Sequence, residues 1–344
     1  MRKKTEIDET DAKILKALMK ESRTSFTELA GLCKISIGAV RMRYAQLKRA
    51  GIVNGEVMLV NPHSLGYKHI SDLGIITSVD HEPEVKECLR GKPYVAHIAG
   101  PFGKYNFWAK VALRDTQELA GILEDLESIP HIRHVDALIW VEAINVEHAE
   151  NLIIKPLIDK NEQVADCKPT TSDNEIAEID ETDRKIARIL SQNSRMPFRR
   201  IAEQLGISTK NVIQRYRRLR RQKVLTLSSI TVDLNKLGYN AMASLFVKAA
   251  NRSKMPEIHT QLLKIPNLIV SIRLIGTYDL YASIVLEDFQ ELFRLNEQIR
   301  RVHGIDKTEI FLTPNVPAWP LNLFPWLLDS KRLPKFFPEI PCAN

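Results

Sequence analysis

Residues 198–223 read FRRIAEQLGISTKNVIQRYRRLRRQK, and this stretch decides the fold of the unit that contains it. The pattern predicts two short helices with a tight turn between them, because Gly206 can take positive φ and Ser208 can cap the second helix. Val212, Tyr216 and Leu219 fall at helical spacing and predict one buried stripe. The opposite face is polar and cationic. Such a helix is typical of those that enter the major groove of DNA, although a solvated basic surface has the same composition.

The polar face of this second helix supplies the candidate DNA contacts. Side chains near its start are placed to test base edges, and the arginines further along are placed to engage phosphates. The candidates are Arg199, Arg200, Ser208, Thr209, Lys210, Asn211, Gln214, Arg215, Arg217, Arg218 and Arg221, with Arg41 and Arg43 at the corresponding place earlier in the chain.

The chain is a tandem duplication. Ile7-Asp8-Glu9-Thr10-Asp11 recurs as residues 179–183, an offset of 172. Further along, Gly103-Lys104-Tyr105 corresponds to Gly276-Thr277-Tyr278 at an offset of 173. Repetition at a fixed period means that one structural unit occurs twice, so both halves are expected to fold alike.

Each copy is predicted to contain two folded units. The first has three helices and then a β-hairpin, which in copy one runs from Val53 through Gly55 to Val60, and this is a winged helix-turn-helix. The second has the order βαββαβ, the ferredoxin-like arrangement with helices on one face of an antiparallel sheet. The expected fold class is therefore α+β. The predicted ranges are 5–60 and 66–148 for copy one, 159–178 for a polar linker, 179–232 and 238–315 for copy two, and 316–344 for a tail rich in proline and aromatic residues.

The two copies differ in charge. The third helix of copy one presents Gly38, Ala39, Met42 and Ala45 where copy two has cationic or polar residues, so copy two is predicted to be the main DNA reader. The bare apolar face of each sheet is expected to pack against its counterpart, either within the chain as a pseudo-dimer or in a homo-oligomer. The tail is expected either to dock on its own domain or to bind a partner protein.

Composition bounds the function classes. The 344 residues carry a net charge of +7, and the four cysteines are scattered without a CxxC pair. The sequence contains no secretory signal, no apolar run long enough for a bilayer, and no P-loop, GxGxxG or HExxH motif. We therefore expect a cytoplasmic protein with reduced thiols and double-stranded DNA as its partner, and we predict no membrane contact, catalytic residue, cofactor or metal.

Together these motifs resemble the Lrp/AsnC family, the feast/famine regulators. The residues that carry the resemblance are the I-D-x-x-D-x-x-I opening, S-R-x-x-F before the second helix, I-S-x-x-x-V-x-x-R-Y-x-x-L in the third, and the G-x-Y-D turn at 276–279. The resemblance implies an archaeal or bacterial transcription regulator that dimerises through its βαββαβ (RAM-type) domains.

The resemblance also implies a free amino-acid effector beside that turn. The implied residues are Gly276, Tyr278 and Asp279 in copy two, and Gly103, Tyr105 and Asn106 in copy one. Asp279 has a carboxylate to offer an α-ammonium group, whereas Asn106 does not. The alternative is that both residues simply stabilise the turn.

Two further functions stay open at this point. Siroheme decarboxylases of haem biosynthesis are similar to this family in fold, and His97 followed by Tyr105-Asn106-Phe107-Trp108 resembles their pattern. The arginine expected between these residues is absent, and copy two has no histidine at that position. A non-specific architectural DNA-binding protein is the other alternative.

Overall fold

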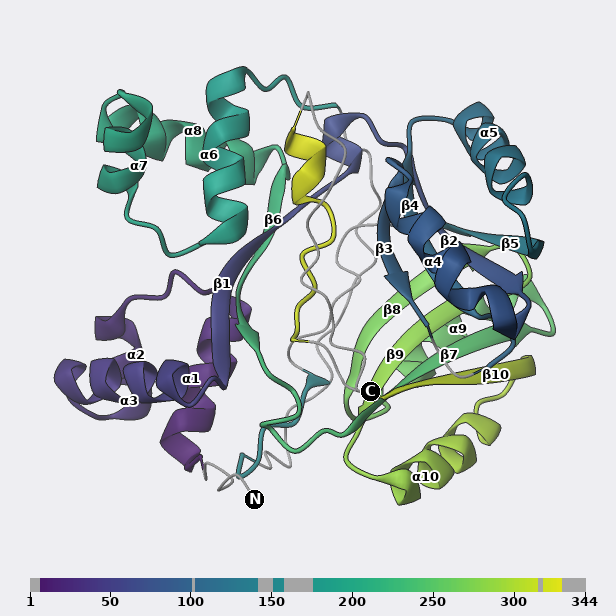
Figure 1. The fold of residues 1–344 in the computed structure, drawn as a ribbon. Coiled ribbons are helices and arrows are strands. Elements are labelled where there is room, and N and C mark those ends of the chain that lie inside the picture. The colour runs from purple at the N-terminus through teal and green to yellow at the C-terminus, as the bar shows by residue number, and fades with distance from the viewer. Residues whose placement is uncertain (1–6, 101–102, 142–150, 158–175, 315–317, 330–344) are drawn as a thin grey trace.

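The computed structural model describes residues 7–100, 103–141, 151–157, 176–314 and 318–329. Two helix-turn-helix units lie on one side of the molecule and two ferredoxin-like domains on the other (Figure 1). The linker predicted at 159–178 lies almost wholly outside the described residues. Within these ranges, every helix is too short or too polar to cross a membrane.

Each helix-turn-helix unit contains the three predicted helices. Copy one has α1 (Glu9–Lys20), α2 (Phe26–Cys33) and α3 (Ile37–Arg49), and copy two has α6 (Glu181–Gln192), α7 (Phe198–Leu205) and α8 (Thr209–Arg221). Asp8 and Asp180 begin the first helix of each copy with a full capping box. The turn before the third helix is left-handed in both copies, with φ of 55° at Lys34 and 66° at Gly206. Copy one therefore holds a lysine in a conformation that favours glycine.

The predicted hairpin after the third helix is wrong. Residues Val53–Val60 form one continuous strand, β1, and Gly55 lies inside it instead of turning the chain. This strand pairs antiparallel with β6 (Leu225–Val232) of the other copy. Met58 and Val60, together with the Glu56 carboxylate that Tyr44 and Lys48 bind, form the buried face of β1. The equivalent strand of copy two completes the ladder that a hairpin would have made. A two-stranded ribbon therefore joins the two helix-turn-helix units.

The ferredoxin-like domains have the predicted order. Copy one contains β2 (His69–Thr77), α4 (Glu82–Gly91), β3 (Val95–Ala99), β4 (Phe107–Leu113), α5 (Thr116–Glu127) and β5 (Ile132–Trp140). Copy two contains β7 (Ala241–Ala249), α9 (Met255–Leu262), β8 (Leu268–Ile275), β9 (Leu280–Leu286), α10 (Phe289–Arg300) and β10 (Ile305–Pro314). Short 3-10 helices, η2 (Val79–His81) and η4 (Arg252–Lys254), precede α4 and α9. The strands form one eight-stranded sheet in the order β10-β7-β9-β8-β5-β2-β4-β3.

The duplicated domains pair within the chain. At the junction of the sheet, Trp140 of β5 pairs with Leu274 of β8. Aromatic rings from both copies fill the space between the two halves: Trp108 stacks on Phe246 at 4.9 Å between ring centroids and meets Phe311 edge-on. Stacked and edge-on aromatic pairs of this kind stabilise an interface beyond their buried area. The chain is therefore an intramolecular pseudo-dimer.

The described part of the tail, residues 318–329, packs on its own chain. Trp319 exchanges two backbone hydrogen bonds of 2.9 Å with Val232 of β6, and its side chain is buried. Asn322 donates to the Ser191 carbonyl oxygen at 2.7 Å, and the ring of Trp326 meets Tyr67 edge-on. Docking on its own domains was one of the two expectations for the tail. Pro317 and the aromatic residues after 329 lie outside the described residues.

Candidate nucleic-acid interface and ligand pocket

Helix α8 has the buried back and exposed front that its sequence predicts. Val212 and Leu219 are fully buried, and Tyr216 packs against Phe198 of α7 with 5.0 Å between ring centroids. Ser208 caps the helix by accepting a hydrogen bond from the Asn211 amide at 3.2 Å. The exposed front consists of Thr209, Lys210, Asn211, Gln214, Arg217 and Arg221.

Two arginines of α8 turn away from this front. Arg215 lies 2.6 Å from an oxygen of Asp180 and 3.0 Å from one of Asp183, and Arg218 binds the other oxygen of Asp183. Burial alone would raise the pKa of Asp180, but hydrogen bonds from the Asp183 amide and from Arg215 outweigh it and hold the pKa below its usual value. Because Asp183 is fully buried, these ion pairs clamp α8 onto α6.

Copy one repeats this clamp with Arg43. Its guanidinium lies 2.7 Å from Asp8 and 3.0 Å from Asp11. Arg43, Arg215 and Arg218 are therefore engaged inside their own units and are not free cations of a DNA-facing surface.

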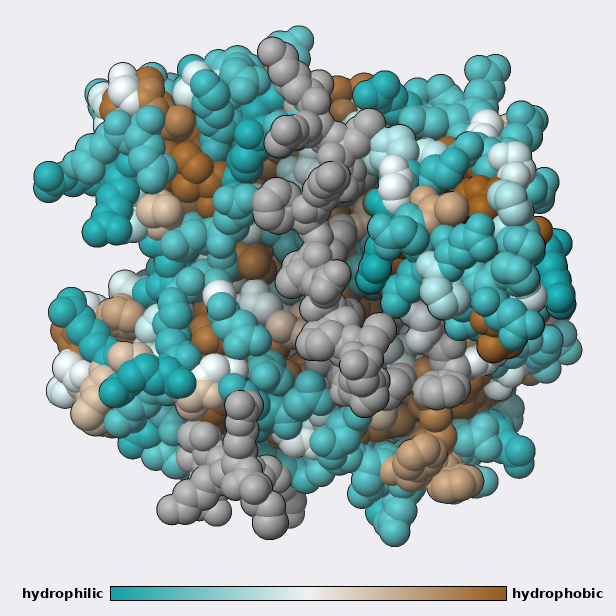
Figure 2. All heavy atoms as spheres, viewed as in Figure 1, coloured by the Kyte–Doolittle hydropathy of each residue, from teal (hydrophilic) through white to brown (hydrophobic). Residues whose placement is uncertain are grey.

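The free cations concentrate on copy two. Arg200, Lys210, Arg217 and Arg221 are exposed and make no ion pair within the part of the chain that the structure describes. Arg199 pairs with Glu203 at 2.9 Å. In copy one, the exposed candidate is Arg41, which lies 5.9 Å from the ring centroid of Phe26. Figure 2 shows the two units as separate lobes on one edge of the molecule, with a gap between them.

A reciprocal contact ties the two units together. Arg23 donates to the carbonyl oxygens of Ser194 and Met196 in copy two, and Arg195 donates to those of Ser22 and Thr24 in copy one. Each guanidinium also covers an aromatic ring of the other copy: Arg23 lies 4.0 Å from the Phe198 centroid, and Arg195 lies 4.9 Å from that of Phe26. We did not predict this contact. The repeated S-R-x-x-F motif contains both residues of this contact, but the sequence does not show that the arginine of one copy contacts the phenylalanine of the other.

A cavity of about 440 Å³ lies where the ribbon, the sheet and the tail meet. Its walls are mostly apolar and include Trp140 of β5 and Trp319 of the tail. Lys110 lines it from β4, 4.8 Å from the Trp140 centroid and paired with Asp72. Lys20, Arg220 and Lys223 line it from the helix-turn-helix side, and among the described residues neither lysine makes an ion pair. Apolar walls with several cations suit a small organic anion. Sequence reasoning missed this pocket because its walls come from segments far apart in the chain.

The predicted effector residues gather at the seam between the two ferredoxin-like domains. Gly103 and Gly276 allow close approach: a Cβ on Gly103 would lie 1.9 Å from the Phe311 ring, and one on Gly276 would lie 2.7 Å from the Ala137 carbonyl oxygen. Tyr278 is buried beside them, and the Tyr105 hydroxyl donates to Asp136 at 2.5 Å.

The polar groups of these two turns are engaged internally. Asp279 is almost fully buried and accepts hydrogen bonds from the Ala249 amide at 3.0 Å and from Arg252 at 2.8 Å. Asn106 donates to Glu82 at 2.6 Å and accepts from the Thr77 amide at 2.9 Å. Both side chains therefore hold their own turn to neighbouring elements.

His97 and the segment Tyr105–Trp108, which together resemble the siroheme decarboxylase pattern, lie in different surroundings. His97 of β3 is opposite Lys110 of β4. Burial and the nearby Lys110 charge lower the pKa of His97 to about 4, so the ring is neutral at physiological pH. Trp108 instead packs on Phe246 at the domain seam, and Tyr105 is bound to Asp136 there.

The chain is similar in sequence to one protein-domain family and to individual transcriptional regulators. The AsnC-type helix-turn-helix domain matches twice, at residues 7–48 and 179–220. The transcriptional regulator LrpA of Pyrococcus horikoshii is 36% identical over 119 residues, which cover 35% of this chain and 84% of LrpA. The regulatory protein AsnC of Escherichia coli is 33% identical over 138 residues, which cover 40% of this chain and 91% of AsnC.

A solved structure matches nearly the whole length. The siroheme decarboxylase NirDL aligns with a TM-score of 0.63 and 17% identity, covering 93% of this chain and 96% of NirDL. At this identity the likeness shows the fold, namely the tandem arrangement of helix-turn-helix and ferredoxin-like units. The sequence identity to LrpA and AsnC, together with the AsnC-type helix-turn-helix domain matched in both halves of this chain, shows that the protein belongs to the Lrp/AsnC family of transcriptional regulators, in a tandem-duplicated form.

Proposed function

We propose that the protein is a sequence-specific DNA-binding regulator whose second helix-turn-helix is the main reader. The observation that carries this proposal is the set of exposed cations on α7 and α8 that make no ion pair among the described residues, namely Arg200, Lys210, Arg217 and Arg221; the corresponding helices of copy one offer two, Arg41 and Arg49. Thr209, Lys210, Asn211 and Gln214 lie at the start of α8, where a recognition helix meets base edges. Arg200, Arg217 and Arg221 are then the phosphate contacts, while Arg215 and Arg218 position α8 from behind.

The test compares binding to the protein's own promoter fragment with binding to a scrambled duplex over a range of salt concentrations. A specific regulator prefers the promoter and loses affinity steeply as salt rises, because bound cations displace counterions from DNA. Asn211→Ala is expected to reduce the preference for the promoter and leave the salt slope unchanged. Equal affinity for both duplexes in the wild type would instead point to an architectural role.

We further propose that a small molecule with a carboxylate group regulates DNA binding from the cavity between ribbon and sheet. The family resemblance implies a free amino acid, whose carboxylate the lysines of the cavity would bind. The walls come from both the DNA-reading unit and the sheet, so a ligand that fits only one arrangement of the two would shift DNA affinity. Lys20 and Lys223 make no ion pair with any described residue, so their ammonium groups can bind a carboxylate. The turn at Gly276–Asp279 is the competing location, and there a ligand would have to displace Arg252 from Asp279.

Two variants separate these locations. Thermal stability is measured with each common amino acid in turn, and any amino acid that raises the melting temperature is then tested on Lys223→Ala and on Asp279→Asn. Loss of the shift in Lys223→Ala alone places the ligand in the cavity, whereas loss in Asp279→Asn alone places it at the turn. No shift with any amino acid would argue against this class of effector.

A siroheme decarboxylase-like activity is the second candidate function. It is favoured by the position of His97 beside Lys110, which lines the cavity, in a chain that shares its whole fold with NirDL. The test is an absorbance titration with siroheme, followed by analysis of the carboxylate groups that remain. If siroheme causes no spectral change and loses no carboxylate, this function is excluded, whereas conversion that His97→Ala abolishes would support it.

A further inference from the structure

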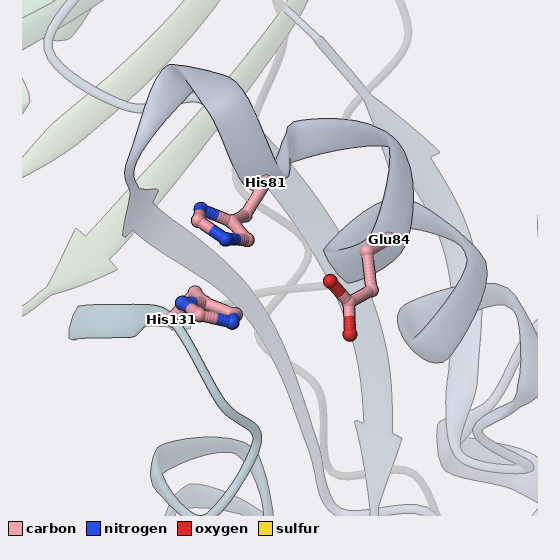
Figure 3. A group of neighbouring side chains, drawn as sticks. All are labelled: His81, Glu84 and His131. Atoms are coloured by element: carbon pink, nitrogen blue, oxygen red, sulfur yellow. The ribbon is translucent and has the colours of Figure 1, made fainter.

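Three side chains with metal-binding atoms meet at one corner of the first ferredoxin-like domain. His81 ends η2, Glu84 lies in the first turn of α4, and His131 lies in the turn before β5. The possible ligand atoms of the three all lie within 4.8 Å of one another. Figure 3 shows the two imidazole rings one above the other and the Glu84 carboxylate beside them. The ring centroids are 3.5 Å apart.

Neighbouring residues at the end of β2 orient the His81 ring and hold the turn that carries His131. The Ser78 hydroxyl lies 2.9 Å from Nδ1 of His81, which leaves Nε2 of that ring for an ion. Thr77 donates its hydroxyl hydrogen to the His131 carbonyl oxygen at 2.7 Å and so holds the turn that carries the second ring. Histidines that bind metals are commonly oriented through their other ring nitrogen in this way. Since His131 is exposed, its ring can rotate so that both free nitrogens face a common point.

The second copy supplies an internal comparison. At an offset of 173, Pro83 and Pro256 both lie in the first turn of their helices, and His81 corresponds to Lys254, Glu84 to Glu257 and His131 to Gly304. In copy two, Lys254 and Glu257 form a plain ion pair of 3.1 Å. Where copy two has an ammonium group, copy one has an imidazole with a second imidazole beside it.

The backbone at His131 strengthens this comparison. His131 has φ of 71° and Gly304 has φ of 93°, and each directly precedes the last strand of its domain. A left-handed conformation is easy for glycine and unfavourable for histidine. Residues held in such a conformation often serve a function that the side chain provides.

We propose that His81, Glu84 and His131 form a zinc-binding site. Zinc prefers imidazole nitrogen and carboxylate oxygen, and three protein ligands leave a fourth position for water or for a group from another molecule. The bound ion supplies the positive charge that Lys254 supplies in copy two, and it links the start of α4 to the turn before β5. Because the site is exposed, zinc can enter without unfolding the domain.

The experiment uses the full-length protein after treatment with a chelator and removal of the chelator. Zinc chloride is titrated calorimetrically, and cobalt(II) is added separately because its visible absorption reports the coordination geometry. The expected result is one equivalent of zinc per chain and a rise in melting temperature on binding. His131→Gly gives copy one the residue of copy two, so this variant is expected to fold at least as stably without metal. Its zinc affinity is expected to fall by roughly tenfold or more.

His134→Ala is the matched control, because His134 is an exposed histidine three residues away that bonds Asp136 instead. It should bind zinc as the wild type does. Failure of the wild type to bind zinc, or equal zinc affinity in the wild type and His131→Gly, would overturn the proposal. The double variant His81→Lys, His131→Gly reproduces the corner of copy two and should stay folded without binding zinc.

Discussion

Adjacent arginines on α8 have opposite surroundings. Arg217 is exposed without an ion pair among the described residues, whereas Arg218 reaches back to a fully buried carboxylate, that of Asp183. A charge paired inside the protein contributes to folding, while an exposed unpaired charge is available to DNA phosphates. Substitution of Arg217 is therefore expected to change DNA binding, whereas substitution of the next residue, Arg218, is expected to change stability.

Alanine substitution of each arginine is expected to separate the two effects. Arg217→Ala should leave the free energy of unfolding unchanged and lower the salt slope of DNA binding by about 0.9. Arg218→Ala should lower the free energy of unfolding by about 2 kcal/mol, since it removes a hydrogen bond to a buried charged group. Urea denaturation and fluorescence anisotropy at several salt concentrations measure both quantities. A stability loss in Arg217→Ala as large as that in Arg218→Ala would contradict the assignment.

His97 is expected to make stability depend on pH. Its pKa is about 4 in the folded protein and 6.5 as a free side chain, so between these values the unfolded chain takes up a proton that the folded protein does not. This contribution is therefore fully present above pH 6.5 and is lost as the pH falls towards 4. His97→Gln should lose stability less steeply than the wild type over that window, as measured by urea midpoints. Identical slopes would show that another group is responsible.

At the scale of elements, two turns set how closely the ferredoxin-like domains approach. Gly103 lies against Phe311 and Gly276 against the backbone of β5, so each copy contributes one glycine to the seam. Space and backbone conformation both favour glycine, because the φ values are 158° and 147°.

Gly103→Ala is expected to destabilise the protein by about 2 kcal/mol, because the new methyl group would force Phe311 to move. Gly31→Ala is the control, since Gly31 lies inside α2 with nothing within 4 Å of the added Cβ. That change should stabilise the protein by about 0.5–1 kcal/mol through helix propensity. Thermal unfolding of both variants provides the measurement. If Gly103→Ala leaves stability unchanged, Gly103 and Phe311 are not in close contact between the two ferredoxin-like domains.

The sequence alone predicted those elements whose signals are local. The predicted cap at Ser208 and the apolar spacing of Val212, Tyr216 and Leu219 located α8. The hairpin prediction failed because the partner of β1 is another strand 172 residues away, and local alternation does not say which strand will pair. The same limit applied to the site. The cationic front of α8 was visible in the sequence, whereas the Arg215 and Arg218 clamps and the pocket depend on tertiary contacts.

At the scale of the whole molecule, one chain holds two helix-turn-helix units in a fixed relation. The ribbon of β1 and β6 joins them, and Arg23 and Arg195 cross between them. Since the ferredoxin-like domains also pair within the chain, a single chain contains both halves of what resembles a dimer.

The two units are expected to contribute unequally to DNA binding. Replacing Lys210, Arg217 and Arg221 with alanine should lower the salt slope by roughly 2.7, whereas replacing Arg41 and Arg49 with alanine should lower it by about 1.8 at most. Hydroxyl-radical footprinting should show stronger protection over the half-site that copy two occupies. Equal protection of both half-sites, together with equal losses from the two sets of changes, would contradict the division of roles.

The two helix-turn-helix units, which Arg23 and Arg195 join, belong to one chain, and this has a consequence for the DNA target. In a dimer of identical subunits every substitution appears twice, so the operator tends to be a palindrome. Here each half has its own codons, and the left-handed turn already shows divergence, with lysine at 34 and glycine at 206. A substitution can therefore change one helix-turn-helix unit and leave the other unchanged. We therefore expect a DNA target whose two ends differ, and a bound complex with a polarity along the promoter.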